Sequence, residues 1–206
     1  MPRIARATVG GICYHVINRG NRRAEVFHNH RDYQAFVKLM ERACNRLPMR
    51  IVSYCLMPNH FHLVSWPHED GDLSRWMQWL LTSHVRRYHR INGTDGRVWQ
   101  GRFKDFPIQQ DDHLLRVVRY VERNALRANL VNRAEQWRWS SLASRGKLDW
   151  LAASPTPLPK DWLDFVNRPE TVPELEALRS SVNRGKPFGG LVWQHDIAKR
   201  LGLSSR

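Results

Sequence analysis

Two histidines in one short extended segment are the first residues of this sequence that could do chemistry. His60 and His62 stand two positions apart in the run Asn59-His60-Phe61-His62-Leu63-Val64. Because successive side chains of a strand alternate between its faces, both imidazoles leave the same face and could share one divalent ion. The same pattern also fits two structural histidines on a half-exposed strand. A metal site therefore requires a third ligand and a reacting group from another element.

Both could come from a helix predicted over residues 110–128, where Tyr120 and Asn124 stand one turn apart. A phenol can attack phosphorus as a nucleophile, and an amide oxygen can complete the coordination of a metal ion. Arg116 and Arg127 share their side of the helix and could offset phosphate charge. An ordinary amphipathic helix with a half-buried tyrosine would give the same pattern. The core stripe of that helix would be formed by Leu114, Val118, Val121 and Ala125.

The rest of the sequence predicts a fold that can bring this strand and this helix together. Hydrophobic periodicity gives a strand, a helix, two strands joined by a tight turn, a helix, an extended segment and a further helix. That order is typical of a ferredoxin-like split βαβ sheet, which is antiparallel and has its first two helices on one face. The predicted class is therefore α+β, with the other face of the sheet free to carry a site. The expected elements lie at residues 12–18, 32–46, 51–56, 60–66, 73–91, 98–108 and 110–128.

The charge of the chain indicates an anionic partner. Among 206 residues, 33 Lys and Arg outnumber 19 Asp and Glu, giving a net charge of +14, and 27 of the basic residues are Arg. Nucleic acid is the first candidate, because the guanidinium fork suits phosphate. Residues 1–146 carry +12 of this charge and residues 147–206 carry +2. We therefore predict a main domain at 1–146 and a mostly helical accessory tail at 147–206 that packs on it.

The cellular compartment is indicated by the absence of membrane-spanning and export signals in the sequence. No apolar run approaches the ~20 residues of a membrane span, and the N-terminal segment has no apolar signal region. Cys13, Cys44 and Cys55 are odd in number and lack metal-type spacing, so they fit buried small hydrophobic residues better than disulfides or a zinc site. We therefore expect a cytoplasmic protein with no membrane partner.

Four motifs in register carry a family resemblance. They are the turn at residues 18–27 (Asn-Arg-Gly-Asn-Arg-Arg-Ala-Glu-Val-Phe), the His strand at 57–64, the segment at 98–103 (Val-Trp-Gln-Gly-Arg-Phe) and the helix end at 120–131. A Trp-Arg-Trp-Ser-Ser run follows at 137–141. Any one motif is weak, whereas four in the same order are specific. Together they resemble the REP-associated tyrosine transposases, single-tyrosine members of the HUH superfamily and of the IS200-like transposases.

This resemblance implies an HUH endonuclease fold and a DNA strand-transfer reaction. His60 and His62 would hold a divalent ion, Mg²⁺ or Mn²⁺, with Asn124 as the third ligand. Tyr120 would attack the DNA backbone to give a 5′-phosphotyrosine and a free 3′-hydroxyl, and reversal would rejoin the strand. The substrate would be single-stranded DNA beside a hairpin formed by a repeated extragenic palindrome (REP). No nucleotide cofactor is expected, and the added tail favours a monomer over a dimer.

Two positions depart from the family pattern. Many relatives have Pro after the asparagine and Gly after the Arg-Ala pair, where this chain has Ala125 and Asn129. Ala125 would let the helix continue past Asn124, so the end of this helix is less firmly fixed.

Basic residues throughout the main domain are expected to contact DNA phosphates. The resemblance implies that the N-terminal region would help to read the single-stranded guide beside the hairpin, although a solvated basic surface is the alternative there. The basic end of the second helix would suit the phosphates of the hairpin stem. Trp99 and Phe103 could stack unpaired bases, although core packing is the favoured use. The expected DNA-binding residues are Arg3, Arg6, Arg19, Arg22, Arg23, Arg86, Arg87, Arg90, Arg102, Arg116 and Arg127.

Two other functions fit the same sequence. An HUH-like module could bind hairpins without turnover, and a basic ferredoxin-like domain could bind RNA. RNA-binding domains of that kind place exposed aromatic residues on the central strands, where this chain has His60 and His62. The presence of both histidines together with Tyr120 and Asn124 favours the metal-dependent DNA transposase.

Overall fold

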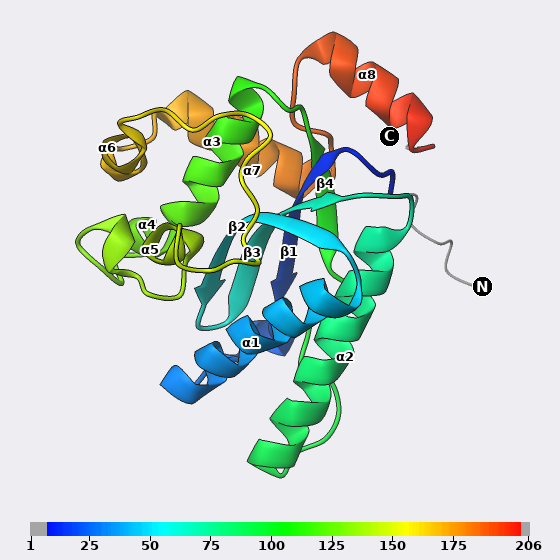
Figure 1. Ribbon diagram of the computed structural model, residues 1–206, viewed down its shortest axis with the longest axis vertical. Coiled ribbons are helices and arrows are strands. Elements are labelled where there is room, and N and C mark those ends of the chain that lie inside the picture. Colours follow the sequence, from blue (N-terminus) through cyan, green and yellow to red (C-terminus); the bar gives the residue numbers. More distant parts are fainter. Residues whose placement is uncertain (1–7, 203–206) are drawn as a thin grey trace.

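An antiparallel four-stranded sheet lies at the centre of the molecule (Figure 1). The computed structural model describes residues 8–202. The strands have the spatial order β2-β3-β1-β4, which is the ferredoxin-like order, so the predicted α+β class and split βαβ topology are confirmed. Their bounds are β1 (Cys13–Arg19), β2 (Met49–Met57), β3 (His60–Pro67) and β4 (Lys104–Ile108).

Helices surround the sheet and make up most of the C-terminal region. Within residues 8–202, no helix combines the length and hydropathy that a membrane span requires. Two short 3₁₀ turns lie at Asn21–Arg23 and Ala134–Gln136. The helices are α1 (His30–Arg46), α2 (Asp72–Asn92), α3 (Asp112–Glu122), α4 (Asn124–Arg127), α5 (Ser141–Ser144), α6 (Trp162–Asn167), α7 (Val172–Arg184) and α8 (Leu191–Arg200).

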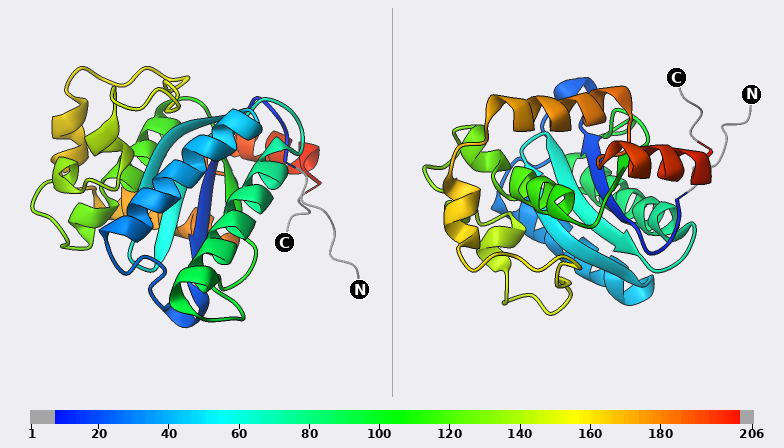
Figure 2. Two further views of the ribbon diagram at one scale, coloured as in Figure 1. Left: turned by 60° about the horizontal axis from the view of Figure 1, so that its bottom comes forward. Right: turned by 90° about the horizontal axis from the view of Figure 1, so that it is seen from above.

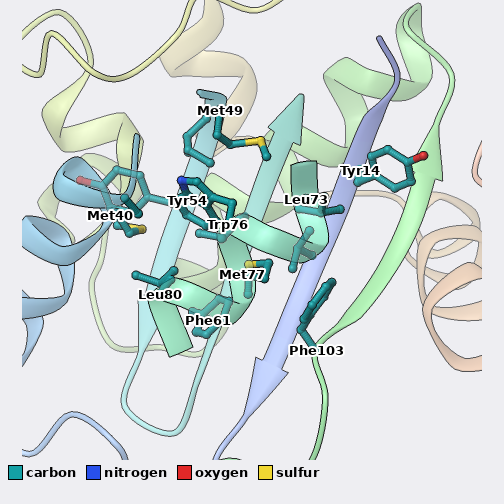
Figure 3. Close-up of a cluster of buried hydrophobic side chains, with 14 of the residues drawn as sticks. Tyr14, Met40, Met49, Tyr54, Phe61, Leu73, Trp76, Met77, Leu80 and Phe103 are labelled. Atoms are coloured by element: carbon teal, nitrogen blue, oxygen red, sulfur yellow. The ribbon is translucent and has the colours of Figure 1, made fainter. Parts of the chain in front are cut away.

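One face of the sheet is covered by α1 and α2 (Figure 2). The helix α1 begins at Asn29, whose side chain accepts a hydrogen bond from the backbone N–H of Arg31. Its apolar face then meets α2 over the sheet, where Trp76 and Phe61 are fully buried (Figure 3). This layer covers one face of the sheet with apolar side chains. A polar functional site therefore has to lie on the other face.

The opposite face of the sheet is covered by α3. Its stripe at helical spacing, predicted as core, is fully buried against β2, β3 and β4. Beside this stripe, Tyr120 of α3 lies over β1 and β3, where its ring contacts those of His15 and His62. The buried stripe consists of Leu114, Val118, Val121 and, in α4, Ala125.

The prediction of a single helix over residues 110–128 is wrong in one respect. A turn at Arg123 divides this segment into two helices, α3 and α4. Arg123 has φ −81° and ψ −6°, but its N–H still bonds the carbonyl of Arg119. The chain therefore bends just before Asn124 without losing that hydrogen bond, and Ala125, a good helix former, carries no signal of the bend. After α4, Asn129 adopts φ +55°, a left-handed conformation that Asn tolerates and that ends the helix.

Both edges of the sheet are covered by segments that come late in the sequence. At the β2 edge, Leu56 N–H bonds the carbonyl of Trp139 at 2.9 Å, and Ala152 N–H bonds the carbonyl of Ile51 at 2.8 Å. At the β4 edge, Phe188 exchanges backbone hydrogen bonds of 2.8 and 2.9 Å with residues 107 and 109. The sheet thus has no long unpaired edge within residues 8–202.

A buried carboxylate links α3 to the segments that follow it. Glu122, fully buried, accepts hydrogen bonds from Ser141 Oγ at 2.6 Å and from the indole N–H of Trp162 at 2.8 Å. It also forms an ion pair with Arg145. One residue of α3 therefore contacts both α5, which precedes residue 146, and α6, which follows it. The domain boundary predicted at residue 146 stays a prediction.

The free energy of unfolding is expected to fall in acid because one histidine is buried in the layer that α1 and α2 form on the sheet. His84 of α2 lies among Phe27, Phe36 and Trp99, and within residues 8–202 its Nδ1 has no hydrogen-bond partner. Burial, with a smaller contribution from Arg87, lowers the pKa of His84 from 6.5 to about 3. Between these values the unfolded chain binds more protons than the folded one, so the free energy of unfolding falls as the pH drops.

Replacing His84 with Phe is therefore expected to flatten the pH dependence of stability between pH 6.5 and 4, by up to about 1.4 kcal/mol per pH unit. Urea unfolding at several pH values measures this slope. The same change at His68, an exposed histidine, is the control and should leave the slope unchanged. Equal slopes for the wild type and His84→Phe would contradict the prediction.

Candidate active site

The register between β1 and β3 places three histidines on the side of the sheet that faces α3. Ile17 lies opposite His62, and Arg19 lies opposite His60, so these side chains share one face. His15, two positions before Ile17 on β1, leaves by the same face. Its Nε2 lies 2.8 Å from Nδ1 of His62. The predicted common face of His60 and His62 is confirmed, and it holds a third imidazole that the sequence analysis did not single out.

Tyr120 of α3 and Asn124 of α4 lie on the same side of the sheet as these histidines. The ring centroid of Tyr120 lies 5.8 Å from that of His62 and 5.9 Å from that of His15. A cavity of about 530 Å³ is lined by His60, His62, Tyr120 and Asn124 together. The strand and helix residues that the sequence proposed as one site therefore line one pocket. Within residues 8–202, the phenol oxygen of Tyr120 makes no hydrogen bond, which leaves it free to meet a substrate.

Arg127 connects the tyrosine, the asparagine and a buried carboxylate. Its guanidinium carbon lies 3.9 Å above the ring centre of Tyr120, and its Nη2 donates to Oδ1 of Asn124 at 3.2 Å. Its Nη1 pairs with Glu170 at 3.0 Å, and the Glu170 side chain is only 4% exposed. Arg123 lies 3.7 Å from the same carboxylate. Arg127 is thus held in place and presents positive charge at the wall of the pocket.

The histidines of the site are neutral at neutral pH. Burial, followed by the charges of Arg19 and Arg127, lowers the pKa of His60 to about 4. Burial also lowers the pKa of His15 to about 3 and holds that of His62 well below its ordinary value. A neutral imidazole keeps one nitrogen lone pair, which is what a metal ion or a proton donor requires.

The donor set of this pocket fits a divalent metal ion. Two neutral imidazoles, His60 and His62, and the amide oxygen of Asn124 line the same cavity. The carbonyl-type oxygen of Asn124 has two lone pairs, so the hydrogen bond from Arg127 leaves one available. In the part of the chain that the structure describes, no three His, Cys, Asp or Glu side chains are grouped as a metal site, and Asn124 offers an amide oxygen as the third donor. Mixed nitrogen and oxygen ligands suit Mn²⁺ and, with water, Mg²⁺.

Comparison with known proteins identifies the family. Residues 8–124 match the family described as transposase IS200 like, which is more than half of the chain and includes every residue of the candidate metal and tyrosine site. This chain belongs to the IS200-like transposase family. It is also 24% identical over 116 residues to a candidate REP-associated tyrosine transposase of Haemophilus influenzae, an alignment that covers 52% of this chain and 66%, just under two thirds, of that relative.

A solved structure of a REP-associated tyrosine transposase bound to a REP hairpin has the same fold. It superposes with a TM-score of 0.56 at 21% identity, covering 84% of this transposase and 99% of that chain. The resemblance to REP-associated tyrosine transposases that the sequence motifs indicated is therefore confirmed as a similarity of both sequence and fold. The family is described as one of transposases, which are enzymes that act on DNA.

The predicted DNA-binding arginines fall into four groups. Arg19, Arg102 and Arg127 line the pocket. Arg116 is exposed on α3 but is not part of the pocket lining. Their contacts with DNA stay a prediction. Away from the pocket lie Arg22 and Arg23 in the turn after β1 and Arg86, Arg87 and Arg90 on α2, and Arg3 and Arg6 lie outside the described residues.

Two other arginines, Arg119 of α3 and Arg123 at the turn after it, hold the C-terminal region of the chain. Arg119 donates to the carbonyls of Arg168 and Pro169, just after α6, and the guanidinium of Arg123 donates to the carbonyls of the last two residues of α6. Trp99 and Phe103, which flank the pocket residue Arg102 in sequence, are 6% and 7% exposed in the core, as the favoured interpretation had it.

Several residues of the site were missed from the sequence. Lys104 faces the pocket because it pairs with Ile17 of β1, and the alternation of β4 could have shown this once its register was known. Arg179 and Asn183 of α7 also line the pocket. They come from a helix in the predicted tail, and no motif in the sequence links that helix to the His strand.

Proposed function

We propose that this transposase binds REP-type DNA hairpins and cleaves and rejoins the adjoining single strand through Tyr120. The observation that carries the proposal is one pocket that combines a free tyrosine hydroxyl, two neutral imidazoles, an amide oxygen and four arginines. Each group has a role in phosphoryl transfer, and no other described pocket combines them. The protein would act in the cytoplasm as a monomer and without a nucleotide cofactor.

In the cleavage step, the phenol oxygen of Tyr120 attacks the scissile phosphorus, and the P–O3′ bond breaks. The phenol proton ends on the departing 3′-oxygen, so the products are a 5′-phosphotyrosine and a DNA end with a 3′-hydroxyl. The reverse attack by a 3′-hydroxyl expels the tyrosine and restores a phosphodiester. The number of phosphoester bonds does not change in either direction, so no external energy source is needed.

The surrounding residues orient the reactants and balance charge. Arg127, fixed between Glu170 and the Tyr120 ring, can hold a phosphate oxygen beside the nucleophile. His60, His62 and Asn124 would hold a Mg²⁺ or Mn²⁺ ion, which supplies a Lewis acid for the phosphate oxygens. Arg19, Arg102 and the neighbouring Lys104 give the mouth of the pocket a positive field that attracts the strand.

The proposed substrate rests on the fold, the relatives and the charge. The solved structure with the same fold was determined with a REP hairpin bound, and the Haemophilus influenzae relative is named for REP association. In this chain the +12 charge of residues 1–146 provides the sequence-independent attraction to the DNA backbone.

The test is a covalent adduct between protein and DNA. End-labelled single-stranded oligonucleotides that carry the palindromes near the gene, with their flanking sequence, are incubated with the protein and Mn²⁺ or Mg²⁺. We expect a labelled protein band on a denaturing gel and a cleaved strand with a 3′-hydroxyl. An oligonucleotide with the palindrome scrambled is the control and should give no band. Binding without an adduct under either metal would support a hairpin-binding module instead, and preference for RNA would support an RNA-binding protein.

A further inference from the structure

We infer that Asn59 and His15 are positioning residues that set the tautomers of His60 and His62. Each would keep a proton on Nδ1 of its neighbouring imidazole and thereby direct the Nε2 lone pair of that imidazole to the divalent ion. The inference rests on the metal site of the proposed function. It concerns two side chains that the sequence analysis left without a role.

The hydrogen bonds of Asn59 determine which ring nitrogen of His60 carries the proton. Nδ2 of Asn59 donates to the backbone carbonyl of Arg23 at 3.1 Å, and a carbonyl can only accept. The amide is therefore oriented with Oδ1 toward His60, where it lies 2.6 Å from Nδ1. Because Oδ1 also only accepts, Nδ1 of His60 has to carry the proton. The lone pair of this neutral imidazole is then on Nε2.

The turn that supplies the Arg23 carbonyl is an unusual one. Arg22 and Arg23 both have positive φ, 53° and 62°, which side chains other than Gly rarely adopt. Gly20 precedes them, and a Cβ at that position would lie 2.1 Å from the carbonyl oxygen of Ala24. The loop therefore has little freedom to move, and it presents the carbonyl to Asn59 at a fixed place.

The His15 contact makes the corresponding choice for His62. Nε2 of His15 lies 2.8 Å from Nδ1 of His62, and both residues are buried, 2% and 5% exposed. One of the two nitrogens must donate. If His62 donates from Nδ1, its Nε2 is free for a metal ion, whereas donation by His15 would place the proton of His62 on Nε2 and remove that lone pair. The metal site therefore requires His15 to be the acceptor.

The two contacts also restrain the rings themselves. The rings of His15 and His62 are nearly parallel, with an interplanar angle of 20°, and meet edge to edge through their nitrogens, while His15 also packs against Phe106 and Tyr120. Partners of this kind fix the rotation of metal-binding histidines, and their loss typically lowers metal affinity 10- to 100-fold.

The tautomers can be read directly in the metal-free wild type. Long-range ¹⁵N–¹H NMR at pH 7.5 distinguishes an Nδ1–H from an Nε2–H imidazole. We expect both His60 and His62 to be Nδ1–H, and an Nε2–H form of either would overturn the inference for that residue. This measurement does not depend on whether the protein binds metal or cleaves DNA.

Metal affinity gives the second readout, by calorimetric titration of the DNA-free protein with Mn²⁺. Asn59→Leu and His15→Phe remove the acceptors and should weaken binding about 10- to 100-fold, whereas Asn59→Asp and His15→Gln, which keep an acceptor, should restore much of it. Asn92→Leu and His84→Phe are matched controls outside the pocket and should bind as the wild type does. Unchanged affinity in Asn59→Leu and His15→Phe would overturn the inference, while failure of the wild type to bind Mn²⁺ would overturn the proposed metal site beneath it.

Discussion

Replacing Tyr120 with Phe is expected to abolish the covalent protein–DNA adduct and strand cleavage. The substitution removes one oxygen atom, the proposed nucleophile, and keeps the ring that contacts His62 and lies beneath Arg127. No other hydroxyl of the pocket can take its place, because the remaining lining residues are basic, amide, imidazole or apolar. We expect a loss of at least about 10³-fold in adduct formation, with hairpin affinity changed by less than about twofold.

The same oligonucleotides used for the wild type measure both quantities, by denaturing gel for the adduct and by fluorescence anisotropy for binding. Tyr54→Phe is the matched control. Tyr54 is buried on the α1 and α2 side of the sheet, where its hydroxyl bonds Ser144 at 3.3 Å, so its change should leave the adduct intact. An adduct at the wild-type level in Tyr120→Phe would remove Tyr120 as the nucleophile.

The second large effect is expected on stability, from Glu122→Ala. The carboxylate has no exposed surface and accepts from Ser141 and Trp162 while pairing with Arg145. Alanine leaves these donors without an acceptor and leaves the arginine without its counter-ion. Removing one partner of a buried ion pair costs about 3–5 kcal/mol, and Arg145, still 25% exposed, places the expected loss near 3 kcal/mol.

Urea unfolding measures the free energy for a graded set of variants at Glu122. Glu122→Gln keeps an oxygen acceptor and should cost less than Glu122→Ala. Glu176→Ala, an exposed position on α7, should change stability by less than about 0.5 kcal/mol. A loss below about 1 kcal/mol in Glu122→Ala would show that the buried carboxylate contributes little net stability.

Local patterns were enough to predict much of the candidate site. The period of a strand placed His60 and His62 on one face, and the period of a helix placed Tyr120 beside Asn124 and Arg127. The first holds because it depends on the geometry of one strand, and the second holds because helical hydrogen bonds continue across the turn at Arg123, from Arg119 to Arg127. The order of strands and helices was enough to predict which sheet would bring the two elements together.

What could not be predicted depends on contacts between residues far apart in sequence. The Glu170 carboxylate that holds Arg127 and the α7 residues at the pocket wall belong to a region with no motif. His15 reads as an ordinary strand residue until the pairing of β1 with β3 brings it to His62. The bend at Arg123 has little local signal either, since Arg123 and Ala125 are good helix formers and Asn124 is the one residue there of weak helix propensity.

The two covered sheet edges bear on how the protein is made. The four strands are synthesised before residue 109, but Trp139, Ala152 and Phe188, which close the two edges, are translated later. While the ribosome is still extending the chain, β2 and β4 therefore present open hydrogen-bonding edges, which are the sites where nascent chains pair wrongly. The β4 edge stays open longer than the β2 edge, because Phe188 is translated after Trp139 and Ala152, and the nascent chain is therefore most exposed to chaperones in the interval before that segment docks.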